Sequence, residues 1–167
     1  MRCYRRLKPV KAISFDLDDT LYDNTPILQK AEQAQLDFLH LKVPQSRQTT
    51  SKDWIAIRYQ LLQIQPDLIH DIGKFRQQGI YHAVRQMGID DTQAEHISQE
   101  AFKVFYQQRN QIQLSAAVMT TLQQLAKHYP LIALTNGNAS IEAIGLSGLF
   151  EFAIGSGDLG LQQKPST

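Results

Sequence analysis

A short apolar segment that ends in a cluster of carboxylates constrains this chain more than any other feature. Residues 10–15 are mostly apolar and are followed at once by Asp-Leu-Asp-Asp-Thr at 16–20. A run of this length suits a buried strand better than a helix. Because side chains alternate along a strand, Asp16 and Asp18 should point to one side while Leu17 points into the protein. Two carboxylates on one side repel each other, so the pattern indicates a cation between them.

A polar turn before a helix is the alternative explanation of this cluster. Asp18, Asp19 or Thr20 could cap the first turn of a following helix by accepting a backbone N–H. That interpretation requires neither the apolar strand nor the alternating carboxylates, so it explains less of the pattern.

The run from Asp16 to Leu21, directly after an apolar strand, resembles the first signature of the haloacid dehalogenase-like (HAD) hydrolases. The similarity continues through Met1-Arg2, Tyr4-Arg5 and the Leu-Tyr-Asp-Asn segment at 21–24. In this longer form the sequence is similar to the bacterial flavin mononucleotide phosphatases of that superfamily, which are linked to dephosphorylation of a riboflavin precursor. The resemblance implies an α/β fold in which a Rossmann-like parallel sheet carries an inserted helical cap.

A helical pattern occupies residues 25–111, which is longer than a simple connection between two strands. Four amphipathic helices are expected, over residues 28–39, 54–64, 75–87 and 94–106. The resemblance implies that 25–111 is a cap over a core made of 1–24 and 112–167. A second independent domain is the alternative, but the chain enters and leaves the insert beside the same strand, which favours a lid.

Aromatic residues recur along this insert and allow two interpretations. At helical spacing they indicate the core of the helical module, although they could also line a pocket for a flat ring. The residues concerned are Trp54, Tyr59, Phe75, Tyr81, Phe102, Phe105 and Tyr106. The five histidines show no paired metal-ligand spacing, so none is expected to be catalytic.

A second strand with polar residues at its end follows the insert. A helix is expected over 116–128, and Pro130 ends it before the apolar strand 131–134. Thr135-Asn136-Gly137 then resembles the second HAD signature, in which the Thr hydroxyl and nearby N–H groups bind a phosphoryl oxygen, and Gly137 would allow close approach. An ordinary strand-to-helix turn would explain these residues taken alone.

A third signature lies near the end of the given sequence. Residues 141–146 should form a short helix and 150–154 a third strand, followed by a glycine-rich loop without a dinucleotide or P-loop spacing. Lys164-Pro165 resembles the third HAD signature, whose Lys neutralises the nucleophile and the phosphate. The family continues with a helix, a fourth strand beside the first and further acidic metal ligands. Without these parts the first strand would have an exposed apolar edge, so we expect either a fragment of a longer protein or a second chain that covers this edge, and we favour the fragment. The 167 residues alone are expected to have weak Mg²⁺ affinity and little turnover.

The resemblance implies hydrolysis of phosphate monoesters through an aspartyl-phosphate. Asp16 would attack phosphorus, and Asp18 would protonate the leaving alkoxide and then deprotonate the attacking water. Mg²⁺ would bind an Asp16 oxygen and the backbone carbonyl of Asp18. Thr135, Asn136 and Lys164 would hold the phosphoryl oxygens. The expected substrate is a small metabolite, such as flavin mononucleotide or a phosphorylated riboflavin precursor.

Other functions are compatible with parts of this pattern. A response-regulator receiver uses acidic residues, a Thr and a Lys around Mg²⁺, but no helical lid follows its acidic pair. A non-catalytic phosphate-binding or interaction module would keep the pocket without the remaining metal ligands. Dehalogenases of the superfamily share the nucleophile but need no acid at the second position, so Asp18 favours phosphate over halide.

Composition narrows the class of partner. The net charge of +1 gives no global reason to expect nucleic acid, and the basic residues among the first eleven suit a solvated tail better than a membrane- or anion-binding arm. Cys3 is the only cysteine, so no internal disulfide is possible and a reducing cytoplasm fits. No segment has the about 18 consecutive apolar residues of a membrane helix. A cytoplasmic protein that binds neither membrane nor nucleic acid is expected, and the sequence does not predict its oligomeric state.

Overall fold

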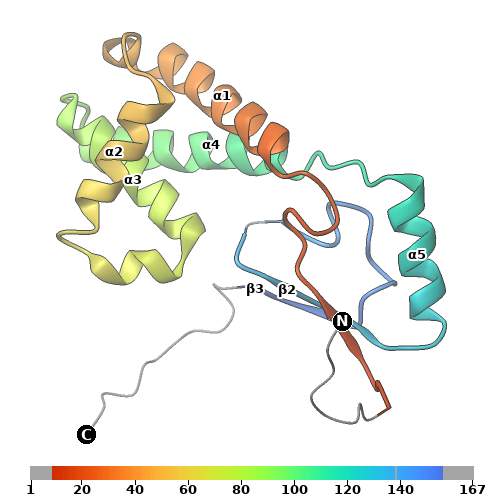
Figure 1. The fold of residues 1–167 in the computed structure, drawn as a ribbon. Coiled ribbons are helices and arrows are strands. Elements are labelled where there is room, and N and C mark those ends of the chain that lie inside the picture. The colour runs from red at the N-terminus through yellow and green to blue at the C-terminus, as the bar shows by residue number, and fades with distance from the viewer. Residues whose placement is uncertain (1–8, 138, 156–167) are drawn as a thin grey trace, which may run out of the picture.

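The computed structural model contains a three-stranded sheet and a separate group of four helices (Figure 1). It describes residues 9–137 and 139–155, so Lys164 and the matches at Met1-Arg2 and Tyr4-Arg5 lie outside the described residues. In chain order the elements are β1 (Ile13–Phe15), α1 (Thr25–Lys42), α2 (Ser51–Leu61), α3 (Ile72–Gln86), α4 (Asp91–Arg109), α5 (Ala116–Ala126), β2 (Leu131–Thr135) and β3 (Phe152–Gly155), with short 3₁₀ helices at Pro44–Ser46 and Pro66–His70.

The strands form one parallel sheet in the order β1-β2-β3. Phe15 of β1 lies beside Ala133 of β2, so the carboxyl ends of these strands leave the same edge of the sheet. β1 is shorter than the strand expected over 10–15, because its pairing with β2 begins only at Ile13. The expected α/β fold with a Rossmann-like parallel sheet is confirmed.

A buried apolar cluster joins the sheet to α5 and to the loop after β1. Leu131 and Ala133 of β2 belong to it together with Leu122 of α5. Leu17 is fully buried in the same cluster, whereas the aspartates on either side of it are more exposed. The alternation predicted for this segment is therefore present at Leu17, and its burial anchors the loop that carries the carboxylates.

Four helices form the insert, with α1 against α4, α4 against α3 and α3 against α2. Two of them begin where an Asp caps the first turn: Asp71 accepts the N–H of Lys74 at 2.9 Å, and Asp90 accepts that of Gln93 at 3.0 Å. All four expected helices are present. Their ends differ from the expected ranges by a few residues, because caps rather than apolar positions set where a helix begins.

Arg76 is buried among these helices and connects three of them. Its guanidinium donates to Glu32 and Gln35 of α1, both at 3.2 Å, and lies 3.6 Å from the centroid of the Phe105 ring of α4. Burial, together with the nearby charge of Arg58, lowers the pKa of Arg76 to about 9. A buried charge is strongly destabilising without partners, so these contacts specify how α1, α3 and α4 pack.

The short helix expected over residues 141–146 is not formed. These residues form consecutive turns, and Gly145 has a φ of +78°, a left-handed conformation that interrupts a helix. Ile141 and Ile144 are nevertheless buried in the sheet cluster, which explains their helix-like spacing. β3 also begins two residues later than expected, at Phe152.

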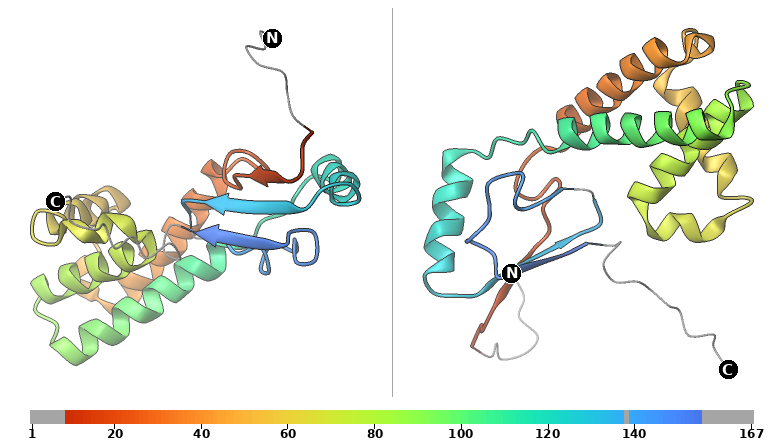
Figure 2. Two further views of the ribbon diagram at one scale, coloured as in Figure 1. Left: turned by 90° about the horizontal axis from the view of Figure 1, so that it is seen from below. Right: turned by 180° about the vertical axis from the view of Figure 1, so that it is seen from behind.

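The two connections between the helical group and the sheet lie side by side (Figures 1 and 2). One leads into α1 at Thr25, and the other leaves α4 at Arg109 toward α5. Two adjacent connections are typical of an inserted lid. We therefore propose a cap formed by 25–111 and a core that contains the described parts of 1–24 and 112–167.

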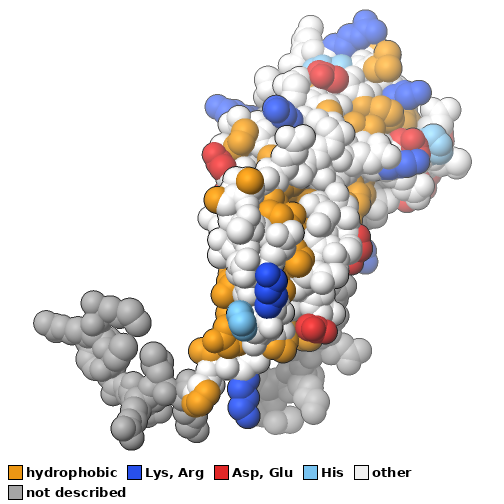
Figure 3. Space-filling model, turned by 90° about the vertical axis from the view of Figure 1, so that its right-hand side faces the viewer, with side chains coloured by type: hydrophobic (Ala, Val, Ile, Leu, Met, Phe, Trp, Pro, Cys, Tyr) orange, Lys and Arg blue, Asp and Glu red, His pale blue; other side chains and the backbone are white. Residues whose placement is uncertain are grey.

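The surface on the side of α5 carries charges of both signs among apolar and uncharged side chains (Figure 3). Two large apolar side chains of the sheet, Leu134 and Phe152, are 44% and 48% exposed. No helix among the described residues is both long and apolar enough to cross a bilayer.

Leu122→Ala is predicted to lower the free energy of unfolding by about 2–5 kcal/mol, because it leaves a cavity in the sheet cluster. Leu122 is 1% exposed, whereas Leu41 is 72% exposed. Leu41→Ala is therefore the matched control and should change the free energy by less than about 0.5 kcal/mol. Urea denaturation followed by circular dichroism measures both, and equal losses would contradict the assignment of Leu122 to the core.

Candidate active site

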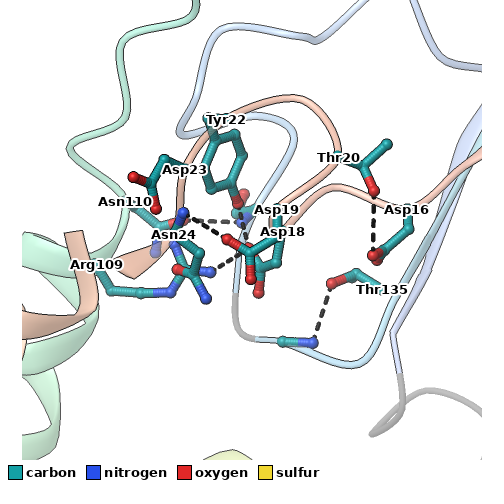
Figure 4. Close-up of polar contacts among 12 residues, drawn as sticks. Asp16, Asp18, Asp19, Thr20, Tyr22, Asp23, Asn24, Arg109, Asn110 and Thr135 are labelled. Carbon is teal, nitrogen blue, oxygen red and sulfur yellow. Dashed lines mark hydrogen bonds and ion pairs between the residues drawn. The ribbon is translucent and has the colours of Figure 1, made fainter. Parts of the chain in front are cut away.

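The loop after β1 carries three aspartates in different environments (Figure 4). Asp16 is exposed, and one of its carboxylate oxygens accepts a hydrogen bond from the Thr20 hydroxyl at 3.5 Å. Asp18 is partly buried. Asp19 has a φ of +56°, and its side chain accepts the N–H of Asn24 at 2.9 Å. Left-handed backbone at a non-glycine residue is uncommon in proteins overall. The few residues that adopt it are concentrated at functional sites.

Asp18 has the strongest contacts of the three. Its Oδ1 accepts a hydrogen bond from the hydroxyl of Tyr22 and forms an ion pair with Nη2 of Arg109, the last residue of α4. Burial and the hydrogen bond to Asp18 raise the pKa of Tyr22, so its hydroxyl stays protonated. Burial alone would lower the pKa of Arg109, but its contacts with Asp18 and Tyr22 raise it, so the guanidinium keeps its charge.

The loop after β2 approaches Asp18 closely (Figure 4). Thr135 ends β2, is 8% exposed, and its hydroxyl oxygen accepts the N–H of Gly137 at 3.0 Å. A Cβ atom at Gly137 would lie 2.2 Å from Oδ2 of Asp18, so only glycine leaves room for the carboxylate in its present position. Asn136, between Thr135 and Gly137 in the chain, is exposed. The sheet thus brings together the two loops that resemble the first and second HAD signatures, the one after β1 and the one after β2.

The connection that leaves α4 also contacts the loop after β2, at Ser140. Asn110 is 7% exposed, and its side-chain oxygen accepts the N–H of Ser140 at 2.8 Å. Its amide nitrogen donates to the carbonyl of Tyr106 at 2.9 Å. Two consecutive residues, Arg109 and Asn110, therefore bind both loops.

A cleft of about 480 Å³ lies between the cap and the ends of β2 and β3. Its lining includes Ile72, Phe102 and Tyr106 from the cap and Thr135, Gly137 and Glu142 from the core. This volume is in the range of sites for small metabolites. The core interpretation is confirmed for Trp54, Phe75 and Phe105, which are buried inside the cap. Phe102 and Tyr106 line the cleft, and a role in binding a flat ring stays a prediction.

The chemistry of the donors decides which cation this loop would suit. Carboxylate and carbonyl oxygens are the ligands that Mg²⁺ prefers. Asp16 is exposed, whereas Oδ1 of Asp18 already binds Arg109 and Tyr22, which suits Asp18 to coordination through its backbone carbonyl. The described residues contain no group of three or more His, Cys, Asp or Glu placed to hold a metal. The metal-binding role predicted for Asp16 and Asp18 stays a prediction, and oxygen donors of this kind are the ones that suit Mg²⁺.

Comparison with protein families gives a match over residues 10–167 to the haloacid dehalogenase-like hydrolases. The chain belongs to this family. The resemblance inferred from the segment Asp16–Leu21 is thereby confirmed, and so is the expectation of an enzyme family with hydrolytic chemistry.

Individual relatives agree with this assignment. The chain is 36% identical over 165 residues to 5-amino-6-(5-phospho-D-ribitylamino)uracil phosphatase YigB of Escherichia coli (strain K12), covering 99% of this chain and 69% of that protein. A 2-haloacid dehalogenase from Pseudomonas syringae pv. Tomato DC3000 has 37% sequence identity to this chain, and its crystal structure superimposes with a TM-score of 0.86. The match covers 91% of this chain and 66% of the dehalogenase. The magnesium-bound HAD-hydrolase YfnB of Bacillus subtilis, at 19% identity and a TM-score of 0.53, shares the fold over 92% of this chain and 68% of its own. The chain thus spans about two thirds of the length of these relatives.

The sequence pattern indicates no role for Arg109, Asn110 or Tyr22. A basic residue in the last turn of an amphipathic helix commonly faces solvent and stabilises the helix dipole, so Arg109 gave no signal of its own. The useful signal was its position, where the helical insert returns to the α/β pattern. Lys164, which was predicted to bind phosphate, lies outside the described residues.

Gly137→Ala is predicted to lower the free energy of unfolding by about 1–3 kcal/mol, because the added methyl group overlaps Oδ2 of Asp18. The same substitution should cost less in an Asp18→Ala background, where the overlapping oxygen is absent. A double-mutant cycle by urea denaturation measures this coupling. Strictly additive losses would contradict the close approach of the two loops.

Proposed function

We propose that the protein hydrolyses the phosphate monoester of a small metabolite through a covalent phosphate on Asp16, in a Mg²⁺-dependent reaction. The observation that carries this proposal is the close approach of Asp18 to Gly137, because Gly137 and Thr135 line a cleft of metabolite size. Membership of the hydrolase family and the 36% identity to a phosphatase support the same conclusion.

Each aspartate has a separate task in this reaction. In the first step an oxygen of Asp16 attacks phosphorus, the bond to the ester oxygen breaks, and the ester oxygen takes a proton from Asp18. In the second step the oxygen of a water molecule attacks phosphorus, the bond to Asp16 breaks, and Asp18 takes a proton from the water. The exposure of Asp16 suits a nucleophile that a substrate must reach.

The loop after β2 would hold the transferred group. The oxygen of the Thr135 hydroxyl already accepts the N–H of Gly137, which leaves its hydrogen to donate to a phosphoryl oxygen. Asn136 and, by resemblance, Lys164 would add further donors. Mg²⁺, held by an Asp16 oxygen and the Asp18 carbonyl, would neutralise charge between nucleophile and phosphate when bound.

Two other functions remain as alternatives. Similarity to the 2-haloacid dehalogenase of Pseudomonas syringae suggests removal of a halide. A departing halide needs no proton, however, so that chemistry would leave Asp18 without a catalytic task. A non-catalytic phosphate-binding module would bind phosphate at Thr135 and release no product.

For the substrate we propose a phosphate ester that carries a flat ring, either flavin mononucleotide or the phosphorylated ribitylamino-uracil on which YigB acts. Phe102 and Tyr106 face the cleft with ring centroids 6.1 Å apart, and Tyr106 is 38% exposed. Aromatic faces of this kind stack on flat rings. A phosphate at Thr135, in the same cleft, would leave the rest of the substrate beside these two aromatic rings.

For the location of the reaction we propose the cytoplasm, because a single cysteine suits a reducing compartment.

Asp16→Asn in the full-length protein is predicted to lower phosphate release from flavin mononucleotide by more than about 10³-fold, because the amide cannot attack phosphorus. Asp37→Asn, at an exposed position of α1, is the matched control and should retain activity. Chelation by EDTA should abolish release, and added Mg²⁺ should restore it. Phosphate binding without turnover in the wild type would instead support the non-catalytic module.

Tyr106→Ala is predicted to raise the KM for flavin mononucleotide by about tenfold through loss of ring stacking. The KM for glycerol phosphate, which has no ring, should stay within about twofold. Tyr59→Ala is the control, since Tyr59 is 58% exposed on α2 and does not line the cleft. Equal effects on both substrates would refute a ring-binding role for Tyr106.

A further inference from the structure

The last helix of the cap ends in a buried charge that touches the proposed acid. Arg109 closes α4, and its side chain is 3% exposed. Its Nη2 forms an ion pair with Oδ1 of Asp18, and its Cζ lies 5.9 Å from the centroid of the Tyr22 ring. The cap and the loop after β1 are thus joined by a direct contact at the site (Figure 4).

This contact gives the two oxygens of Asp18 different surroundings. Oδ1 accepts from both Arg109 and Tyr22. Oδ2 is the atom that a Cβ at Gly137 would meet first, so it faces the loop that begins at Thr135. Rotation of a carboxylate exchanges its oxygens unless one of them is held. Two donors on Oδ1 therefore fix the direction of Oδ2.

We propose that Arg109 is a positioning residue, which holds Oδ1 of Asp18 so that Oδ2 is directed at the ester oxygen of the bound phosphate. The inference rests on the proposed phosphatase function and extends it, because neither the three signatures nor the similarity to known relatives assigns a role to Arg109. The side chain of Asn110, the next residue, holds the N–H of Ser140 at 2.8 Å. The connection from α4 to α5 is therefore anchored to the loop after β1 through Arg109 and to the loop after β2 through Asn110. This holds Arg109 at a fixed place relative to the site.

The path of the proton determines which substrates should depend on this positioning. When the bond from phosphorus to the ester oxygen breaks, the electron pair stays on that oxygen, which takes the proton from Oδ2 of Asp18. Asp18 is then the ionised partner of Arg109, and the water of the second step returns a proton to Oδ2. Arg109 donates to Oδ1 throughout and transfers no proton. An alkoxide is a poor leaving group and needs this proton, whereas p-nitrophenolate departs without it. The contribution of Arg109 should therefore depend on the leaving group.

The test compares two substrates on one preparation of Arg109→Gln in the full-length protein with Mg²⁺. The quantity is kcat/KM, which covers the steps up to cleavage of the ester and excludes later hydrolysis of the intermediate. We expect a fall of about 10–100-fold for flavin mononucleotide, an alkyl phosphate, and of less than about threefold for p-nitrophenyl phosphate. The ratio of the two values does not depend on how much of the preparation is folded. Arg109→Lys keeps the charge without the planar fork and should give an intermediate ratio.

Two further variants make the outcome specific. Arg85→Gln is the matched control, since Arg85 forms a more exposed ion pair with Asp91 at 2.8 Å, and its ratio should equal that of the wild type. Asp18→Asn should show the same dependence on leaving group, and adding Arg109→Gln to it should cause little further loss. Equal losses for both substrates in Arg109→Gln, including complete loss of both, would overturn the positioning role. Hydrolysis of neither substrate by the wild type would refute the proposed function itself, which is a distinguishable result.

Discussion

The parallel pairing of β1 with β2 is the contact on which the arrangement of the site depends. In its register Phe15 lies beside Ala133, so the chain leaves both strands at the same edge and brings the Asp16 loop to the Thr135 loop. Leu17, fully buried, reinforces this register from one side. A slip by one residue would turn this leucine out of the core and carry the carboxylates away from Gly137.

Two buried arginines show how charge is used differently in the cap and at its boundary. Transfer of a charge from water to the interior costs several kcal/mol, so each must keep its partners. Among the described residues, the hydrogen-bond partners of Arg76 are Glu32 and Gln35, both in the cap, and its effect is to fix the packing of helices. Arg109 has its partner in the core, so its desolvation is offset only while cap and core stay in this relative position.

The parts of this structure that follow from local periodicity were accessible from the sequence, and those that depend on distant contacts were not. The alternation at Leu17 and the spacing of the four helices identified buried faces correctly. The helix expected over 141–146 was wrong because buried isoleucines three residues apart also occur in consecutive turns. Spacing alone could not separate Phe102, which lines the cleft, from Phe105, which is buried three residues later. Arg109 was missed because its partner lies in another segment.

Arg109 belongs to the cap by secondary structure and to the core by contact. The part of the insert that can be exchanged as a module therefore ends one residue before helix α4 does. A chimera that replaced residues 25–108 with a different lid would keep both anchors of the return connection, whereas replacement of all of 25–111 would remove them. Lids of different size and specificity could thus follow one another on the same core over evolution, provided that the arginine and the asparagine at the point of return are inherited with the core.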